Sequence, residues 1–145
     1  MRSGTADEPA ADVEELVRRY FAVVADLAST ADDLRPLLSA DLRVVEHPNA
    51  VTPTGATRDL TDTIAGFHAG KSLLREQQFD IHEILAVDDR AAVRGTWKGT
   101  IRVAAGPYSS GQQLVAHVAA IVTTRDGQII HHESFDCYEP ITPLR

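Results

Sequence analysis

Cysteine is nearly absent from this sequence. The only one among 145 residues is Cys137, so no disulfide can form within the chain and no cysteine-rich zinc site can be built. Long apolar runs are also missing, and none approaches the ~20 residues that cross a bilayer. The opening stretch, MRSGTADEPAAD, lacks the apolar segment of a secretion signal. These absences predict a protein of the reducing cytoplasm without a membrane partner.

Positive charge is scarce as well. The chain has 14 Lys and Arg against 21 Asp and Glu, a formal net charge of -7 at pH 7. Nucleic acids bind clustered basic residues, so we do not expect a nucleic-acid partner. A length of 145 residues with 43% hydrophobic residues is typical of one globular domain. We therefore predict a disordered leader over residues 1–11, a single domain over residues 12–145 and a small hydrophobic ligand.

Three segments in the first half have the apolar spacing of amphipathic helices. Between residues 12 and 28, apolar side chains recur every three or four positions. A short second helix is predicted within residues 30–40. A third begins near residues 57–59, carries Phe67 on its apolar side and ends at Gly70.

The second half changes to the two-residue period of β-strands. The clearest alternation covers residues 90–104, with Trp97 on the apolar face and Gly95 and Gly99 as points where the strand can bend. Other strands, separated by tight turns, are predicted over residues 79–87, 113–124 and 128–139. Helices followed by hairpins predict an α+β fold: three N-terminal helices packed on a strongly curved antiparallel sheet that encloses a cone-shaped pocket.

This order of elements and three sequence stretches resemble the nuclear transport factor 2-like superfamily. Within it, the SnoaL-like polyketide cyclase and ketosteroid isomerase-like branch is the most similar. The stretches are RRYFAVV on the first helix, VVEHPNAVTPTG at a strand end and RDGQIIHHESFDCYEP near the end of the chain. The resemblance covers residues 12–140 and implies the conical fold and a homodimer. Because this fold carries several kinds of enzyme and also non-catalytic proteins, it does not decide the activity.

Two residues match positions that ketosteroid isomerases use. Those enzymes have an aspartate base before a proline at this strand end, where the present chain has His47. An imidazole titrates near neutral pH, so the resemblance implies that His47 is the general base. It implies that Tyr20 on the first helix donates a hydrogen bond to a developing oxyanion. The alternatives are a strand-end contact for His47 and core packing for Tyr20. Glu46 would face the other side of its strand and is the weaker candidate.

The rest of the family apparatus is not matched. The isomerases have a protonated aspartate near residues 119–120, which are alanines here, and His117 is the only polar residue nearby. The polyketide cyclases have an acid in the last strand, where the resemblance places Ser134. Asp136 is the expected substitute, with a surface carboxylate as the alternative. Steroid isomerisation by the family mechanism is therefore not predicted.

Four residues are expected to contact the ligand. Ser134 and His132 share one face of the last strand with Asp136, and alternation does not decide whether that face lies inside the cone. The other two are Phe67 and Trp97, although Trp97 would suit a core aromatic equally well. Two connections rich in Gly, Pro, Ser and Thr are expected at the rim of the cone, over residues 48–59 and 104–113.

The six histidines raise the question of a metal site. His131 and His132 point to opposite faces of a strand and cannot bind one ion together, and no HExxH spacing is present. We predict no metal and no cofactor. A site assembled from His47, His117 and a carboxylate is the lesser alternative.

The leading hypothesis is a cofactor-independent enzyme that abstracts a proton next to a carbonyl in a hydrophobic cyclic or polyketide-like metabolite. Isomerisation, cyclisation or dehydration would follow. His47 would be the base, Tyr20 the oxyanion donor, and His117 and Asp136 the second acid/base or orienting groups. One alternative is a non-catalytic ligand-binding or dimerisation module of the same fold. Another is a water-activating enzyme such as an epoxide hydrolase, although the Asp-Arg-Asp arrangement of those enzymes is not evident.

Overall fold

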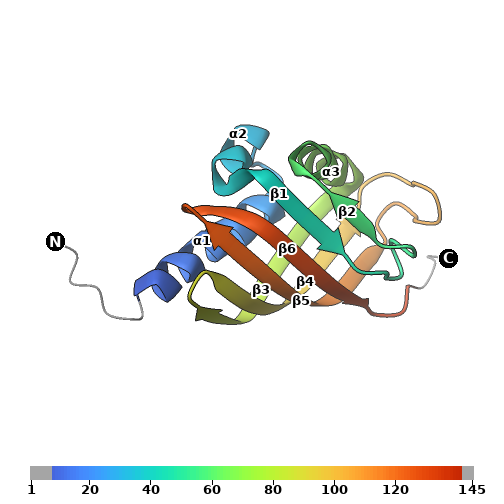
Figure 1. Ribbon diagram of the computed structural model, residues 1–145. Helices are drawn as coiled ribbons and strands as arrows, with labels where there is room; N and C mark the ends of the chain where they lie inside the picture. Colours follow the sequence, from blue (N-terminus) through green and yellow to red (C-terminus); the bar gives the residue numbers. More distant parts are fainter. Residues whose placement is uncertain (1–7, 142–145) are drawn as a thin grey trace.

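Three helices pack on one six-stranded sheet, and two of its strands lie between the second and third helices along the chain, as the computed structural model in Figure 1 shows. The structure describes residues 8–141. Its elements are α1 (Glu8–Ala25), α2 (Ala31–Leu34), a 3-10 turn (Arg35–Leu37), β1 (Leu38–Glu46), β2 (Ala56–Arg58), α3 (Leu60–Leu73), β3 (Leu74–Val87), β4 (Arg90–Ile101), β5 (Gln113–Arg125) and β6 (Gln128–Tyr138). Within the described residues, no helix has both the length and the apolar character to span a bilayer.

The N-terminal helix begins earlier than its sequence pattern predicts. Residues 1–7 of the predicted leader lie outside the described part of the chain, whereas residues 8–11 belong to α1. One side of α1 is buried at helical spacing by Val13, Val17 and Tyr20. This side faces the sheet, and β3 is the strand that α1 contacts most.

The other two helices are set by caps and by proline. Thr30 and Asp33 form a capping box at the start of α2, but Pro36 follows so closely that the helix gives way to the 3-10 turn. The short helix predicted within residues 30–40 therefore ends at Leu34, and β1 already begins at Leu38. Asp59 caps α3 by accepting a hydrogen bond from the backbone N–H of Asp62 at 2.8 Å.

The sheet has the strand order β2-β1-β6-β5-β4-β3. Most neighbours are antiparallel, as predicted, but β1 runs parallel to β6. This pairing places Glu46 beside Ser134. The predicted α+β fold of helices on a curved sheet is confirmed, with the correction that the sheet is mixed.

The sheet bends sharply at the hairpin of β3 and β4. Its register shifts between Ile81 and Glu83, and Gly95 lies opposite this bulge. A Cβ on Gly95 would come within 2.6 Å of the Asp80 carbonyl oxygen and 2.8 Å of the Phe79 ring. The close approach requires glycine, so the bend predicted at this position has a steric basis.

Buried apolar side chains form two clusters. The larger joins α1 and the segment around Leu34 to the inner faces of the strands, including Val93, Val122 and Ile129. The smaller contains Leu74, Ile101 and Leu114. The core is therefore divided between two parts of the cone.

Candidate functional site

A hollow of about 410 Å³ lies between the helices and the inner face of the sheet. Its wall is mostly apolar and includes five aromatic rings, those of Phe21, Phe79, Trp97, Tyr108 and Tyr138. The predicted rim loops contribute Val51, Thr52 and Tyr108. A hollow of this size and lining suits a small, largely apolar molecule.

A second hollow of about 300 Å³ adjoins the first beneath α3. The two share a set of lining residues: Val24, Glu46, Gly66, His132, Ser134 and Asp136. Four members of this set are polar, and all four come from the parallel pair β1 and β6. We refer to these four, Glu46, His132, Ser134 and Asp136, as the polar end of the site.

Strand alternation directs the polar end inward. On β6, His132 and Ser134 are buried and Asp136 is half-buried, whereas Phe135 between them is exposed. The face of β6 that carries His132, Ser134 and Asp136 is therefore the inner face, a point that the sequence did not decide. A register shift between β5 and β6 near Thr124 explains why Ile129 is buried as well, although simple alternation places it on the opposite face.

His132 is joined to Tyr20 on α1. The Tyr20 hydroxyl lies 2.8 Å from His132 Nδ1, and the two residues are only 4% and 9% exposed. Burial lowers the pKa of His132 to about 4, with the neighbouring His131 adding to the effect and Glu46 opposing it. Burial raises the pKa of Tyr20. Both groups are therefore neutral at physiological pH.

Asp136 is held by the neighbouring inward residue of its own strand. The Ser134 hydroxyl donates to Asp136 Oδ1 at 2.5 Å. Burial raises the pKa of Asp136, and the negative charge of Glu46 raises it further, while the Ser134 hydrogen bond lowers it. Tyr138, the next inward residue, also has its pKa raised by burial and by Asp136.

Glu46 has the opposite electrostatic balance. Burial alone would raise the pKa of its carboxyl, but hydrogen bonds from Asn49, Arg58 and Thr52 outweigh burial and lower it. The Arg58 guanidinium donates at 2.8 Å, and so does the Asn49 amide. Glu46 is therefore ionised at neutral pH, whereas Asp136 is easier to protonate than an ordinary aspartate. Two carboxyl groups with pKa values moved apart are the usual basis of acid/base chemistry in one site.

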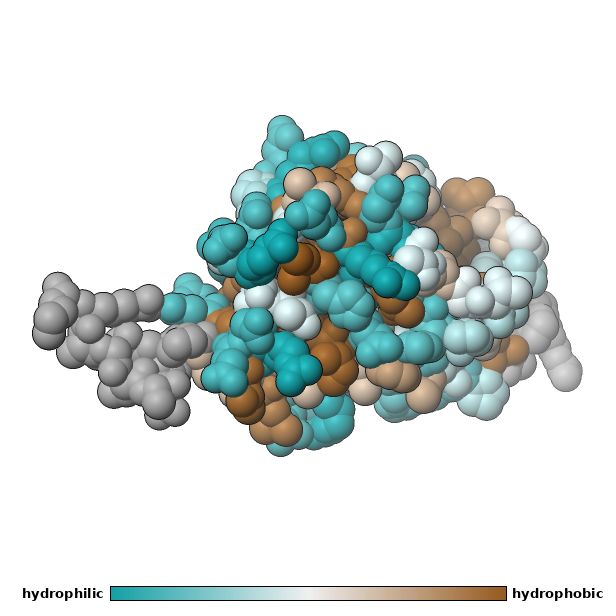
Figure 2. All heavy atoms as spheres, in the orientation of Figure 1, coloured by the Kyte–Doolittle hydropathy of each residue, from teal (hydrophilic) through white to brown (hydrophobic). Residues whose placement is uncertain are grey.

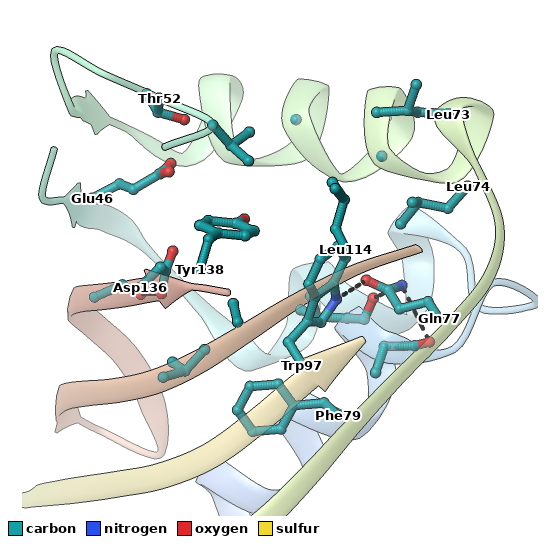
Figure 3. Close-up of a pocket in the computed structure, with 18 of the residues that line it drawn as sticks. Glu46, Thr52, Leu73, Leu74, Gln77, Phe79, Trp97, Leu114, Asp136 and Tyr138 are labelled. Carbon is teal, nitrogen blue, oxygen red and sulfur yellow. Dashed lines mark hydrogen bonds between the residues drawn. The ribbon is translucent and has the colours of Figure 1, made fainter. Parts of the chain in front are cut away.

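Trp97 is fixed on the opposite wall. Its Nε1 donates to Gln77 Oε1 at 2.8 Å, and the Gln77 amide donates to the carbonyls of Val24 and Ala25 at the end of α1, each at 3.2 Å. Figure 3 shows this chain of hydrogen bonds facing Glu46, Asp136 and Tyr138 across the hollow. Phe67 lines only the adjoining hollow under α3.

The expected orientation of His47 into the cone is wrong. Its ring stacks on Phe135 with 4.4 Å between centroids, and its Nε2 lies 2.8 Å from Glu133 Oε2 with 39% of the side chain exposed. The reason is alternation on β1, because Val44 and Glu46 face inward and the following residue faces outward. Counting by two from the buried Val44 would have identified Glu46, the site residue that sequence reasoning ranked lower.

His117 also lies outside both hollows. Its side chain is 60% exposed, and its Nε2 is 2.8 Å from Glu139 Oε2. It pairs across strands with Cys137, which is exposed. The structure therefore brings Tyr20, Asp136 and the four expected ligand contacts to the hollows and leaves both His47 and His117 on the outer face of the sheet.

No cluster suited to a metal ion occurs within residues 8–141, counting groups of three or more His, Cys, Asp or Glu. His47 and His117 each pair with a different glutamate. The lesser alternative of a shared metal site between them is not supported by these contacts.

Comparison with known proteins gives a consistent fold. A family model described as a SnoaL-like domain matches residues 17–132. The solved structures with a similar fold include three whose descriptions name an activity. IdmH of Streptomyces antibioticus, described as a candidate polyketide cyclase, has a TM-score of 0.71 at 17% identity, covering 86% of this chain and 91% of that one. A candidate SnoaL-like polyketide cyclase from a Jannaschia species has a TM-score of 0.71 at 18% identity, covering 92% and 91%.

The third, AclR of Streptomyces galilaeus, is described as a candidate hydroxylase and has a TM-score of 0.68 at 18% identity, covering 88% of this chain and 79% of that one. No curated protein sequence matches the chain. At these identities the likeness concerns the fold, and the chemistry has to be argued from the site.

Proposed function

Since the chain belongs to the SnoaL-like domain family, we propose that it is a cofactor-independent enzyme that moves a proton next to a carbonyl group. The substrate would be a hydrophobic cyclic or polyketide-like molecule. The observation that carries this proposal is the polar end of an otherwise apolar hollow, where Asp136 has a raised pKa beside an ionised Glu46.

Asp136 is the proton-transferring group in this proposal. In its ionised form it accepts a proton from the carbon next to the carbonyl, and the electron pair of that bond moves onto the carbonyl oxygen. The protonated Asp136 then returns the proton to another carbon or to a leaving group. A raised pKa makes the carboxylate a stronger base and lies closer to neutral pH, where proton transfer is most efficient. The aromatic walls, including Trp97 and Phe79, would hold the rings of the substrate.

Hydrogen–deuterium exchange of a simple cyclic ketone tests the proposal. 2-Tetralone in D₂O, followed by proton NMR, reports proton abstraction without knowledge of the natural reaction. We expect the wild type to accelerate exchange and D136N to lose about 10²- to 10³-fold of that rate, as for a general base. Asparagine preserves the volume and can still accept from Ser134, so the melting temperature should change little. A D136N rate equal to the wild-type rate would contradict the proposal.

His47 supplies the matched comparison. H47A should keep the wild-type exchange rate, because the ring lies on the outer face of the sheet. A loss in H47A with full activity in D136N would instead support the sequence-based assignment of the base. If tetralone raises the melting temperature of the wild type without any exchange, the protein is the ligand-binding module that the sequence also allowed.

The contact of Glu46 with Arg58 favours a second candidate, the hydrolysis of an epoxide. An ionised Glu46 would accept a proton from water as the water oxygen attacks the epoxide carbon. A protonated Asp136 would donate its proton to the epoxide oxygen as the C–O bond breaks, giving a diol. Indene oxide, with E46Q as the variant, distinguishes this reaction. Diol formation that is lost in E46Q, without ketone exchange in the wild type, would select it.

We also propose a homodimer, as the family resemblance implies. Phe135 and Ile121 are exposed on the outer face of the sheet, at 43% and 38%, and lie diagonally across β5 and β6. In the view of Figure 2, hydrophobic side chains form small patches among hydrophilic ones. An interface on this face would therefore combine apolar contacts with polar ones.

A further inference from the structure

Within the described residues, His132 has an unpaired ring nitrogen and belongs to the wall of the ligand site. It lines both hollows, it is only 9% exposed, and its Nε2 has no hydrogen-bond partner among residues 8–141. A buried polar atom without a partner destabilises the folded state. This atom has almost no exposed surface of its own, so a small rotation of the ring toward the hollow would let a ligand supply the missing partner.

The partner of the other ring nitrogen decides what Nε2 can do. The Tyr20 hydroxyl is buried, keeps its proton and, within the described part of the chain, bonds only to His132 Nδ1. A phenol proton needs an acceptor, and a neutral imidazole has one acceptor nitrogen and one N–H. If Tyr20 donates to Nδ1, the ring proton must be on Nε2. This assignment follows from satisfying the hydroxyl, since hydrogen positions are assigned from the hydrogen-bond network.

We propose that Tyr20 is a positioning residue that fixes His132 as a neutral Nε2–H donor, and that this donor binds a carbonyl oxygen of the ligand at the polar end of the site. The sequence implied instead that the Tyr20 hydroxyl itself binds the oxygen. The hydroxyl is already bonded to His132, so the histidine N–H takes that place.

The surrounding charges define the ligand further. A neutral donor can stabilise negative charge that develops on the carbonyl oxygen and still keep its own proton. Arg58 offsets part of the charge of Glu46, but the mostly apolar wall disfavours an ionised ligand such as a carboxylate, whose charge would be buried there without a free partner among the described residues. The structure therefore assigns the site to an uncharged ketone with a flat, apolar body. This inference deepens the proposed function and shares with it the assumption that the hollow holds such a ligand.

The position of the ring proton can be measured without any ligand. In ¹⁵N-labelled protein, two-bond ¹H–¹⁵N correlations distinguish the two neutral tautomers and the protonated ring. We expect His132 to show the proton on Nε2 alone, unchanged from about pH 8 to about pH 5.5, because its pKa is near 4. H132Q identifies the signal by its loss, and H82Q does so for an exposed histidine on the outer face. A proton on Nδ1, or a protonated ring in this range, would overturn the inference.

Y20F tests the positioning role in the same experiment. Without the hydroxyl, Nδ1 loses its donor and the two tautomers should become mixed. An unaltered Nε2–H pattern in folded Y20F would show that Tyr20 does not set the tautomer. This reading concerns the ring only, so it stands even if the exchange reaction proposed above is not found.

The ligand contact is tested with 9-fluorenone and fluorene, which differ by one carbonyl. In the wild type the carbonyl stretch of bound fluorenone should move to lower frequency, as for a hydrogen-bonded ketone. H132F should lose this shift, and its preference for fluorenone over fluorene should fall about tenfold, which is one net hydrogen bond. H132Q, which keeps an N–H, should retain part of both effects.

D136L separates the two possible donors, because leucine has no N–H or O–H group in its side chain. If the carbonyl shift survives in D136L and disappears in H132F, His132 is the donor. A shift that disappears in D136L and survives in H132F would assign the donor to a protonated Asp136 and overturn the inference. Should H132F fail to fold, a wild-type spectrum without a shifted carbonyl would overturn it equally. Loss of exchange in D136N with an intact carbonyl shift in D136L would support both proposals separately.

Discussion

At the scale of single residues, the site depends on how its neighbours set the pKa of Asp136. Ser134 lowers this pKa by donating to the carboxylate, and the charge of Glu46 raises it. The two influences have opposite signs and come from side chains that can be changed separately. The site therefore allows the pKa of its proposed base to be moved in either direction.

Two variants should move the pH profile of ketone exchange in opposite directions. The rate needs ionised Asp136, so it rises with pH through the pKa of that residue. S134A removes the hydrogen bond, raises the pKa and should move the rising limb to higher pH. E46Q removes the negative charge and should move it to lower pH. Exchange rates of 2-tetralone against pH, corrected for buffer catalysis, provide the measurement. Limbs that coincide in all three proteins would show that Asp136 does not control the rate.

His132 should make the fold sensitive to acid. Its pKa is 6.5 in the unfolded chain and about 4 in the folded one. Between these pH values the unfolded state binds more protons, so the free energy of unfolding rises with pH on account of this residue. The contribution is about 3 kcal/mol, fully present above pH 6.5 and lost as the pH falls toward 4.

Urea unfolding of the wild type and H132Q at several pH values checks this expectation. The raised pKa of Asp136 acts in the opposite direction, but it is common to both proteins and largely cancels in their difference. From pH 7 to pH 4, the free energy of unfolding of the wild type should fall by about 3 kcal/mol more than that of H132Q. A constant difference would mean that the folded ring has an ordinary pKa.

At the scale of elements, the bend in the sheet depends on one glycine. A Cβ at Gly95 would meet the Asp80 carbonyl oxygen at 2.6 Å, and backbone on a paired strand cannot move aside cheaply. G95A should therefore destabilise the fold by about 1–3 kcal/mol and displace Phe79 from the wall of the hollow. Gly66 in α3 is the matched control, because a Cβ there meets nothing within 4 Å. G66A should stabilise by about 0.4–1 kcal/mol. Equal melting temperatures for the two variants would contradict the steric argument.

Periodicity was a good guide to the elements and a poorer guide to their pairing. The change from helical to two-residue spacing near Gly70 correctly separates α3 from the hairpins. The parallel contact of β1 with β6 leaves no local mark, because it joins segments far apart in the sequence. The irregularity near Thr124 likewise depends on the neighbouring strand. These two features decide which residues meet at the polar end.

The same limit explains the outcome for individual site residues. Tyr20, Trp97 and Asp136 could be selected by residue type and by family resemblance, and all three line a hollow. His47 was favoured because an imidazole before a proline matched the place of a family base. The direction of its side chain was set instead by the alternation of β1, because Val44 is buried and His47, three residues later, faces the other side. Residue type suggested the chemistry, and the alternation of side chains along each strand decided which of them face the hollow.

At the scale of the whole molecule, the proposed homodimer gives a direct prediction. F135E places a charge on the outer face of β6 and should convert a dimer to a monomer in sedimentation velocity, without loss of the tyrosine–histidine contact inside. V103E is the control, since Val103 is also exposed, at 59%, but lies in the connection after β4. It should leave the dimer intact. A wild type that sediments as a monomer, or an F135E dimer, would contradict an interface on this face.

The parallel contact between β1 and β6 also sets the order in which the hairpin and the binding site form during refolding. The hairpin that carries Trp97 closes through a tight turn after Val87, whereas bringing Glu46 beside Ser134 requires closing a loop that contains most of the chain, which is entropically the slower event. Tryptophan fluorescence should accordingly recover before fluorenone binding does in a stopped-flow experiment. A newly synthesised chain would not bind the proposed ketone until β1 and β6 had paired.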